Sequence, residues 1–178
     1  MTLFTARAVE PAVLTELRTA DDAGRRPVPY PTGDGGEPLR CCLRPARPGE
    51  RLVLVSYAPL RRWAAATGAR PGAYDEVGPV FVHAGPEDCD GPADCDGPAA
   101  DPAAGQGPGA YPFERERVLR TVRRYGADGR ILGGRLVQLP GLHGAFTDAF
   151  ADPAVALVHV RAVEHGCFLF EVRRPPAG

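Results

Sequence analysis

The chain has 178 residues, a formal net charge of −1 and five cysteines, and its length suits one domain with its own hydrophobic core. The balanced charge provides no long-range field for nucleic acid or an anionic membrane surface, so neither is an expected partner. All 21 basic residues are arginine, and Ser56 is the only serine. These absences exclude lysine Schiff-base chemistry, phosphate-binding Gly-Lys-Ser/Thr loops and serine hydrolases of the Gly-X-Ser-X-Gly type.

The N-terminal segment lacks the apolar run of a signal peptide, and no segment reaches the ~20 apolar residues of a membrane span. We therefore expect a cytoplasmic protein whose cysteines stay free thiols or act as ligands. The chain also lacks asparagine. Lysine and asparagine have AT-rich codons, so their joint absence is typical of a GC-rich bacterial genome.

The N-terminal half is expected to combine short helices with two strands. Residues 11–19 are predicted to form a helix, because a proline suits the first turn and the apolar residues recur at helical spacing. The Gly/Pro/Asp-rich residues 21–37 are predicted to form a loop. The apolar runs 51–57 and 79–84 are predicted strands, separated by a short helix over residues 60–67.

The C-terminal half is expected to consist mainly of strands. Residues 118–125 fit both a helix and a strand. Strand is favoured because residues 126–129 are typical of a hairpin turn and residues 130–138 continue as a strand. A helix over residues 142–150 precedes two further strands. Strands with few helices between them predict an α+β fold with a mainly antiparallel sheet, in a single domain over residues 1–178.

Residues 85–112 have a different composition from the rest of the chain. They are almost wholly Gly, Pro, Ala and Asp, and the hexapeptide Asp-Cys-Asp-Gly-Pro-Ala occurs twice in tandem. Such a segment has too few large apolar side chains to offset the conformational entropy of ordering it, so we expect a flexible insert. Cys89 and Cys95 stand near His83 in the sequence, but their spacing does not match a zinc-binding pair.

The last two predicted strands, residues 156–162 and 166–172, hold reactive side chains within a strongly apolar pattern. Alternate residues of a strand face opposite sides, so His159 and Arg161 share one face. Matching the apolar faces of the two strands places Cys167 opposite Arg161. The pattern therefore predicts one polar sheet face that carries all three side chains.

The same register predicts the rest of both faces. Phe168 and Phe170 should lie together on the opposite, apolar face with Val158 and Val160, while Glu171 can join the polar face. An even-numbered connection would instead place an arginine among the phenylalanines, which is unfavourable for an unpaired charge.

The polar face has two interpretations. In the first, it is the floor of a binding site, where Arg161 and His159 bind a small anion and either His159 or Cys167 is the catalytic group of an enzyme. In the second, it is a half-exposed structural face, on which Arg161 pairs with Glu171 and Cys167 is an inert packed thiol.

Two further positions carry candidate side chains. Arg40 precedes the vicinal cysteines Cys41 and Cys42, where a guanidinium can bind an anion or lower the pKa of a thiol. The two cysteines are not expected to form a disulfide with each other, because the eight-membered ring strains the peptide. His83 is a further ligand-binding candidate. With His159 it provides only half of a metal site, so no metal site and no cofactor are predicted.

Several segments carry a resemblance to a known family. In chain order they are Arg40-Cys-Cys-Leu43, then residues 47–57, 74–83, 117–131 and 150–161, and finally Gly166-Cys-Phe168. Together they resemble the bacterial domain of unknown function 1203 family, over roughly residues 35–174 outside the insert. Family members often read Pro-Cys-Arg where this chain has Pro38-Leu39-Arg40, so the resemblance does not imply an essential thiol there. It implies a single-domain bacterial protein and no particular reaction.

We therefore expect a small protein that binds a small anionic molecule at a sheet face. The candidate binding residues are Arg161, His159, Arg40 and His83. A thiol- or histidine-dependent enzyme acting on a small metabolite is one alternative, and a non-enzymatic interaction module is the other.

Overall fold

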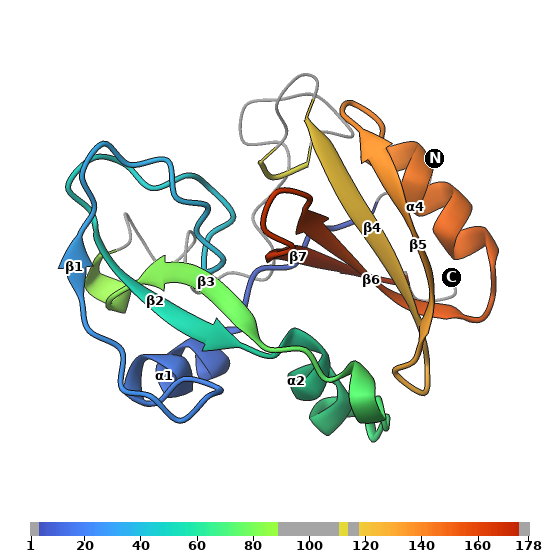
Figure 1. The fold of residues 1–178 in the computed structure, drawn as a ribbon, viewed down its shortest axis with the longest axis horizontal. Helices are drawn as coiled ribbons and strands as arrows, with labels where there is room; N and C mark the ends of the chain where they lie inside the picture. Colours follow the sequence, from blue (N-terminus) through green and yellow to red (C-terminus); the bar gives the residue numbers. More distant parts are fainter. Residues whose placement is uncertain (1–3, 89–110, 114–117, 175–178) are drawn as a thin grey trace.

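Two antiparallel sheets lie side by side in the computed structural model, the first built from the N-terminal half of the chain and the second from the C-terminal half (Figure 1). The structure describes residues 4–88, 111–113 and 118–174. Most of the predicted insert over residues 85–112, including Cys89 and Cys95, lies outside the described residues. The predicted α+β fold with antiparallel strands is confirmed.

The N-terminal sheet has the strand order β1-β2-β3. The elements of this half are α1 (Pro11–Thr19), β1 (Tyr30–Pro31), β2 (Arg51–Tyr57), α2 (Pro59–Thr67), the 3-10 helix η1 (Gly72–Tyr74), β3 (Gly78–His83) and the 3-10 helix η2 (Pro86–Asp88). A proline begins both α1 and α2. The backbone N–H that proline lacks would have no carbonyl partner at this position of a helix. Leu14 and Leu17 of α1 are buried in one core with β2 and β3. The predicted helix 11–19 and strand 51–57 are confirmed with the same bounds, whereas β1 lies inside the predicted loop.

The C-terminal sheet has the strand order β5-β4-β6-β7, and every neighbouring pair is antiparallel. Its elements are β4 (Leu119–Gly126), β5 (Ile131–Gln138), α4 (Leu142–Ala151), β6 (Val155–Ala162) and β7 (Phe168–Arg173). The segment that fitted both helix and strand is therefore a strand, because β4 pairs with β5 on one side and with β6 on the other. Within the described part of the chain, no helix combines the length and the apolar composition needed to cross a bilayer.

The two faces of the C-terminal sheet have different partners. One face is covered by α4 and forms a core that contains Val160 and Phe170 (Figure 1). The other face meets the N-terminal half, where Tyr125 shares a small core with Trp63 of α2. The polar side chains His159, Arg161 and Glu171 of this second face are therefore buried between the two sheets.

A β-bulge changes the predicted pairing of the last two strands. Val160 pairs with Phe170 as expected, but the register then shifts and Arg161 pairs with Phe168 instead of Cys167. A bulge sets two residues of one strand against one residue of the other, so the simple alternation is interrupted. The prediction that Phe168 and Phe170 share one face is wrong. Phe168 belongs to the core of the N-terminal sheet, where its ring meets Tyr57 edge-on at 5.5 Å.

Candidate functional site

One rung of the C-terminal sheet carries charged and titratable side chains across its width. Arg123 stands opposite His159, and His159 stands opposite Glu171. Arg7 continues the rung, because it forms a β-bridge with Glu171. Residues directly opposite each other on neighbouring strands have adjacent side chains on one face. The predicted polar face with His159 and Glu171 therefore exists, and it is turned toward the N-terminal half of the molecule.

His159 is fully buried on this face. Its ring centroid lies 4.7 Å from that of Tyr125 and 5.1 Å from that of Phe168. Neither ring nitrogen has a hydrogen-bond partner among the described residues, and Nε2 is 3.8 Å from Glu171 Oε2. Burial, reinforced by the nearby arginines, holds the pKa of His159 well below its ordinary value. The imidazole is therefore neutral at neutral pH.

A buried neutral His159 predicts a pH-dependent stability. The pKa of His159 in the folded state lies below its value near 6.5 in the unfolded chain. As the pH falls through 6.5, the unfolded chain binds a proton that the folded chain does not, so the free energy of unfolding decreases. Between pH 7.5 and 5.5 this group alone should lower the free energy of unfolding by about 1.4 kcal/mol. Urea unfolding of the wild type and of His159→Leu should diverge by that amount over this range. A stability difference that stays constant with pH would contradict the assignment.

Arg161 is buried on the same face, but its partners differ from the predicted one. Its Nη2 lies 2.8 Å from Glu76 Oε2, and its Nη1 donates to the carbonyl oxygen of Gly166 at 3.0 Å. Glu76 also accepts a hydrogen bond from Arg123 at 2.6 Å. The predicted pair between Arg161 and Glu171 is therefore replaced by an arginine pair that shares Glu76.

Cys167 is partly exposed and precedes β7. Its Sγ lies 3.7 Å from the carbonyl oxygen of His165, and the bulge leaves it outside the ladder with Arg161. The described contacts of its side chain therefore do not include His159. The two catalytic candidates are not brought together as a thiol–imidazole pair.

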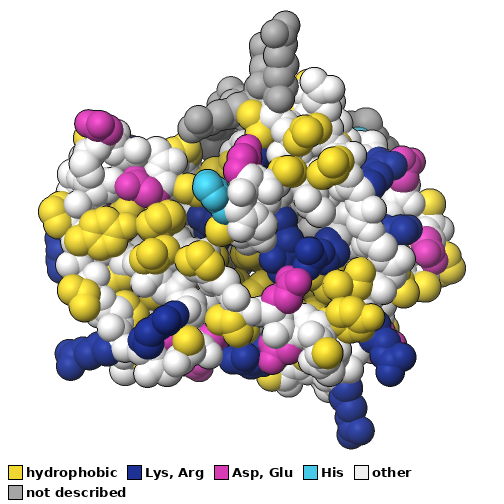
Figure 2. Space-filling model, in the orientation of Figure 1, with side chains coloured by type: hydrophobic (Ala, Val, Ile, Leu, Met, Phe, Trp, Pro, Cys, Tyr) yellow, Lys and Arg dark blue, Asp and Glu magenta, His cyan; other side chains and the backbone are white. Residues whose placement is uncertain are grey.

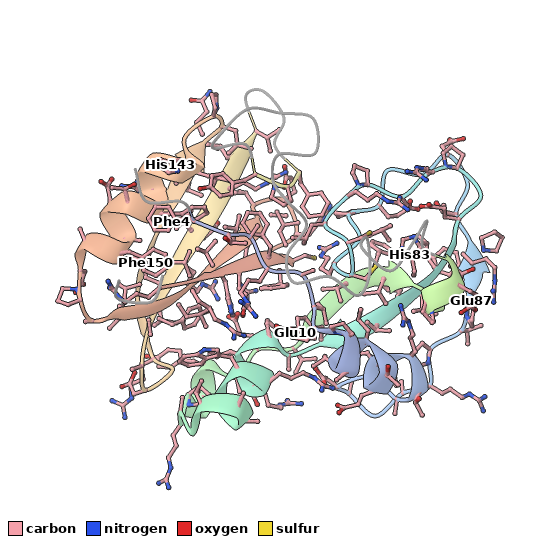
Figure 3. All side chains as sticks on the ribbon, turned by 180° about the vertical axis from the view of Figure 1, so that it is seen from behind. Phe4, Glu10, His83, Glu87, His143 and Phe150 are labelled. Atoms are coloured by element: carbon pink, nitrogen blue, oxygen red, sulfur yellow. The ribbon has the colours of Figure 1, made fainter. Side chains whose placement is uncertain are left out.

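A cavity of about 110 Å³ lies between β7 of the C-terminal sheet and the helices α1 and α2; we call it the inter-sheet cavity. Its lining includes three arginines and three aromatic residues, namely Arg7, Arg62, Arg173, Tyr57, Trp63 and Phe168. Two carboxylates, Glu10 and Glu171, also reach it. Figure 3 shows Glu10 where the chain enters α1, in the middle of the molecule between the sheets. Arginine side chains also gather between the sheets on the face that Figure 2 shows.

The carboxylate of Glu171 holds two of these arginines. Its Oε1 accepts a hydrogen bond from Arg173 Nε at 2.7 Å, and Arg173 Nη2 lies 2.6 Å from the same oxygen as an ion pair. Arg7 Nε lies 3.7 Å away. Burial raises the pKa of Glu171, and Arg173 opposes that rise. Burial also raises the pKa of Tyr57, so its hydroxyl stays protonated at neutral pH.

Polar groups of three residues stand beside the inter-sheet cavity. Tyr57 and Trp63, which line the cavity, contribute a hydroxyl and an indole N–H. Arg7 Nε is buried and has no hydrogen-bond partner among residues 4–88, 111–113 and 118–174. Buried polar groups are normally hydrogen-bonded, so an unused donor beside a cavity points to a ligand or to water.

Arg40 connects the two halves of the molecule. It is only 2 % exposed, and its Nε donates to the carbonyl oxygen of Phe168 at 2.8 Å. Its Nη1 donates to the carbonyl oxygen of Pro38. Burial lowers the pKa of Arg40 to about 10, which leaves the guanidinium charged at neutral pH. Arg40 holds the backbone at the start of β7 and is not part of the cavity lining described above.

A second cluster lies at the far end of β3 and consists of Cys41, Cys42 and His83; we call it the Cys–His cluster. His83 Nδ1 is 3.2 Å from Cys41 Sγ and 3.9 Å from Cys42 Sγ, and the two sulfur atoms are 3.9 Å apart. All three residues are buried. Within the described residues, this is the group of three histidine, cysteine or acidic side chains close enough together to hold a metal ion.

The backbone explains how the Cys–His cluster forms. Leu39 makes a parallel bridge to Phe81, and Arg40 N–H donates to the carbonyl oxygen of Phe81 at 2.9 Å. The two cysteines therefore lie beside the end of β3, where His83 is placed (Figure 3). The vicinal cysteines and the histidine were visible in the sequence. The bridge that joins them was not, because it pairs residues about forty positions apart.

The electrostatics of the Cys–His cluster distinguish its two thiols. The contact with the Cys42 thiol lowers the pKa of Cys41, whereas contact with Cys41 and burial raise the pKa of Cys42. On the other side of the imidazole, His83 Nε2 is 3.6 Å from Glu50 Oε2. Arg44 donates to both oxygens of Glu50, at 2.7 and 3.0 Å, and holds the pKa of that carboxyl at about 2. A fixed carboxylate therefore lies behind the histidine.

Comparisons with known proteins place the chain in a family. No curated protein and no solved structure gave a significant match. The model of a family described as "Protein of unknown function (DUF1203)" matches residues 36–174. This range contains every strand of the C-terminal sheet, the cysteines and histidine of the Cys–His cluster, and most of the cavity lining. The chain therefore belongs to the DUF1203 family.

Proposed function

We propose that the protein binds a small anionic molecule in the inter-sheet cavity. The observation that carries the proposal is the presence of three guanidinium groups, from Arg7, Arg62 and Arg173, around one cavity. Arginine stays charged at every physiological pH and presents five N–H donors in a fixed plane. Carboxylates and phosphates match this geometry with paired hydrogen bonds.

Acidic partners orient the arginines without using all of their donors. Arg62 donates to Asp22 through Nε and Nη2 and to Glu16 through Nη1. Arg173 donates to Glu171 through Nε, and Arg7 donates to Glu10 through Nη2. Each guanidinium keeps further N–H groups for a ligand, because five are available on each. The Tyr57 hydroxyl adds a neutral donor, and the Arg7 Nε–H, which has no hydrogen-bond partner among the described residues, adds a charged one.

The size of the cavity limits the ligand. A cavity needs only ~10–15 Å³ of this kind of volume for one water molecule, so about 110 Å³ has room for a small organic or inorganic anion. Aromatic rings form part of the wall and lower the local dielectric, which strengthens each charged hydrogen bond inside. These features favour a small carboxylate or phosphate over a nucleotide.

The proposal is one of binding, and it differs from the histidine-dependent alternative. His159 contacts Glu171, which lines the cavity, but His159 is itself absent from the lining described above. The free thiols Cys41, Cys42 and Cys167 agree with the reducing bacterial cytoplasm that we propose as the location.

The single tryptophan gives a direct test, because Trp63 lines the inter-sheet cavity. Titration with acetate, oxalate, bicarbonate and phosphate at constant ionic strength should change Trp63 fluorescence in a saturable way for at least one of them. Chloride at the same ionic strength should not. If none of these anions gives saturable fluorescence or calorimetric heat, the proposal is wrong.

Two matched pairs of variants locate the binding. Tyr57→Phe removes one donor and should weaken binding about tenfold, because a hydrogen bond to a charged group is involved. Tyr74→Phe, at an exposed tyrosine of η1, should leave affinity unchanged. Arg7→Met should weaken binding by at least about tenfold, and Arg130→Met, in an exposed turn, should not. If the cavity variant and its exposed control change the affinity equally in either pair, the anion binds outside the inter-sheet cavity.

A further inference from the structure

We propose that Cys41, Cys42 and His83 form a binding site for one tetrahedral, thiophilic metal ion of the Zn²⁺ class. This site is independent of the inter-sheet cavity. It rests on the geometry of three buried donor atoms that come from two separate segments of the chain.

The distances between the donor atoms match those around tetrahedral zinc. Zinc–sulfur bonds of about 2.3 Å and zinc–nitrogen bonds of about 2.0 Å place two sulfur ligands about 3.8 Å apart and a sulfur and a nitrogen ligand about 3.5 Å apart. The observed sulfur–sulfur distance is 3.9 Å, and the two sulfur–nitrogen distances are 3.2 and 3.9 Å. An ion can therefore enter with shifts of a few tenths of an ångström in the side chains.

The environment of His83 fits a metal ligand. Its Nδ1 faces the sulfur atoms, while its Nε2 lies 3.4 Å from Arg44 Nη2 and 3.6 Å from Glu50 Oε2. Metal-binding histidines commonly have a carboxylate beside their second nitrogen, and Glu50 is the carboxylate on that side of this ring. Glu50 is itself fixed by Arg44 and by the backbone N–H of Arg47, which donates at 2.7 Å.

The charges also favour a divalent ion. Two thiolates and one divalent cation sum to zero, so a bound ion leaves no net charge on these donors within the apolar core. Thiolate and imidazole are the ligands that select zinc and other soft ions over magnesium or calcium. Three protein ligands leave the fourth tetrahedral position for water or a small ligand.

The test isolates the two thiols of the site. In a background with Cys89→Ser, Cys95→Ser and Cys167→Ser, the only cysteines are Cys41 and Cys42. Reduced protein of this background should bind one equivalent of Co²⁺, with a near-ultraviolet thiolate-to-cobalt charge-transfer band and the visible bands of a tetrahedral ion. Zn²⁺ should displace the Co²⁺ and raise the midpoint of thermal unfolding.

Further substitutions in the same background separate ligation from folding. Cys42→Ser should remove the 1:1 complex, His83→Gln should weaken it at least about a hundredfold, and Glu50→Gln should weaken it about 10–100-fold. Circular dichroism monitors the fold of each variant. Where a variant does not fold, a second test uses the folded background. Zn²⁺ should then protect Cys41 and Cys42 from reaction with an alkylating reagent. No Co²⁺ complex in the background, a complex that survives Cys42→Ser, or thiols that Zn²⁺ leaves unprotected would overturn the proposal.

Discussion

Replacing Leu142 with alanine should lower the free energy of unfolding by about 2–5 kcal/mol. Leu142 is 1 % exposed and begins α4, the helix that covers one face of the C-terminal sheet. Truncation removes apolar contact and leaves a cavity between this helix and the sheet, which relaxes only in part. Urea denaturation of the purified protein measures the loss.

The matched control is Leu136→Ala on β5, where the same side chain is 60 % exposed. Its truncation should cost less than about 1 kcal/mol, because little apolar area leaves water when the protein folds. Similar losses at the two positions would mean that α4 does not pack on the sheet as described.

Replacing Arg173 with methionine should lower the free energy of unfolding by about 2–3 kcal/mol at pH 8. Removing one partner of a fully buried ion pair costs about 3–5 kcal/mol, and we discount this because the Arg173 side chain is 40 % exposed. The variant leaves the carboxylate of Glu171, only 9 % exposed, with Arg7 Nε at 3.7 Å as its nearest remaining guanidinium nitrogen.

The pH dependence of this loss is also expected. The pKa of Glu171 is already raised by burial, and losing Arg173 raises it further. As the pH falls from 8 to 5, the carboxyl of the folded variant takes up a proton and the deficit should shrink. The control is Arg135→Met on β5, which removes an exposed ion pair with Asp148 of α4. It should lower the free energy of unfolding by less than about 1 kcal/mol at either pH. A deficit for Arg173→Met that grows on acidification would contradict the role given to Glu171.

The regular elements could be predicted because their patterns are local. A proline before helically spaced leucines defined residues 11–19, and the hairpin turn after residue 125 settled the choice of strand for β4. His159 and Glu171 could be placed on one face because alternation within each strand is enough for that inference.

The candidate sites depend on contacts that no local pattern encodes. The bulge beside Arg161 breaks the alternation on which the predicted position of Phe168 rested. Glu76, the partner of Arg161, comes from the connection before β3. The inter-sheet cavity combines side chains from the N-terminal segment, from α1, α2 and β2, and from β7. The Cys–His cluster depends on one parallel bridge, and pairing of that kind has no sequence period to reveal it.

The bulge in β7 also determines how the two halves of the molecule depend on each other. Phe170 is buried in the core under α4, while Phe168, two residues earlier in the chain, is buried in the core of the N-terminal sheet. Opening either sheet alone would expose one of these aromatic rings to water. One strand thereby couples both cores, and the free energy that holds each sheet closed is shared with the other, as in a single cooperative folding unit.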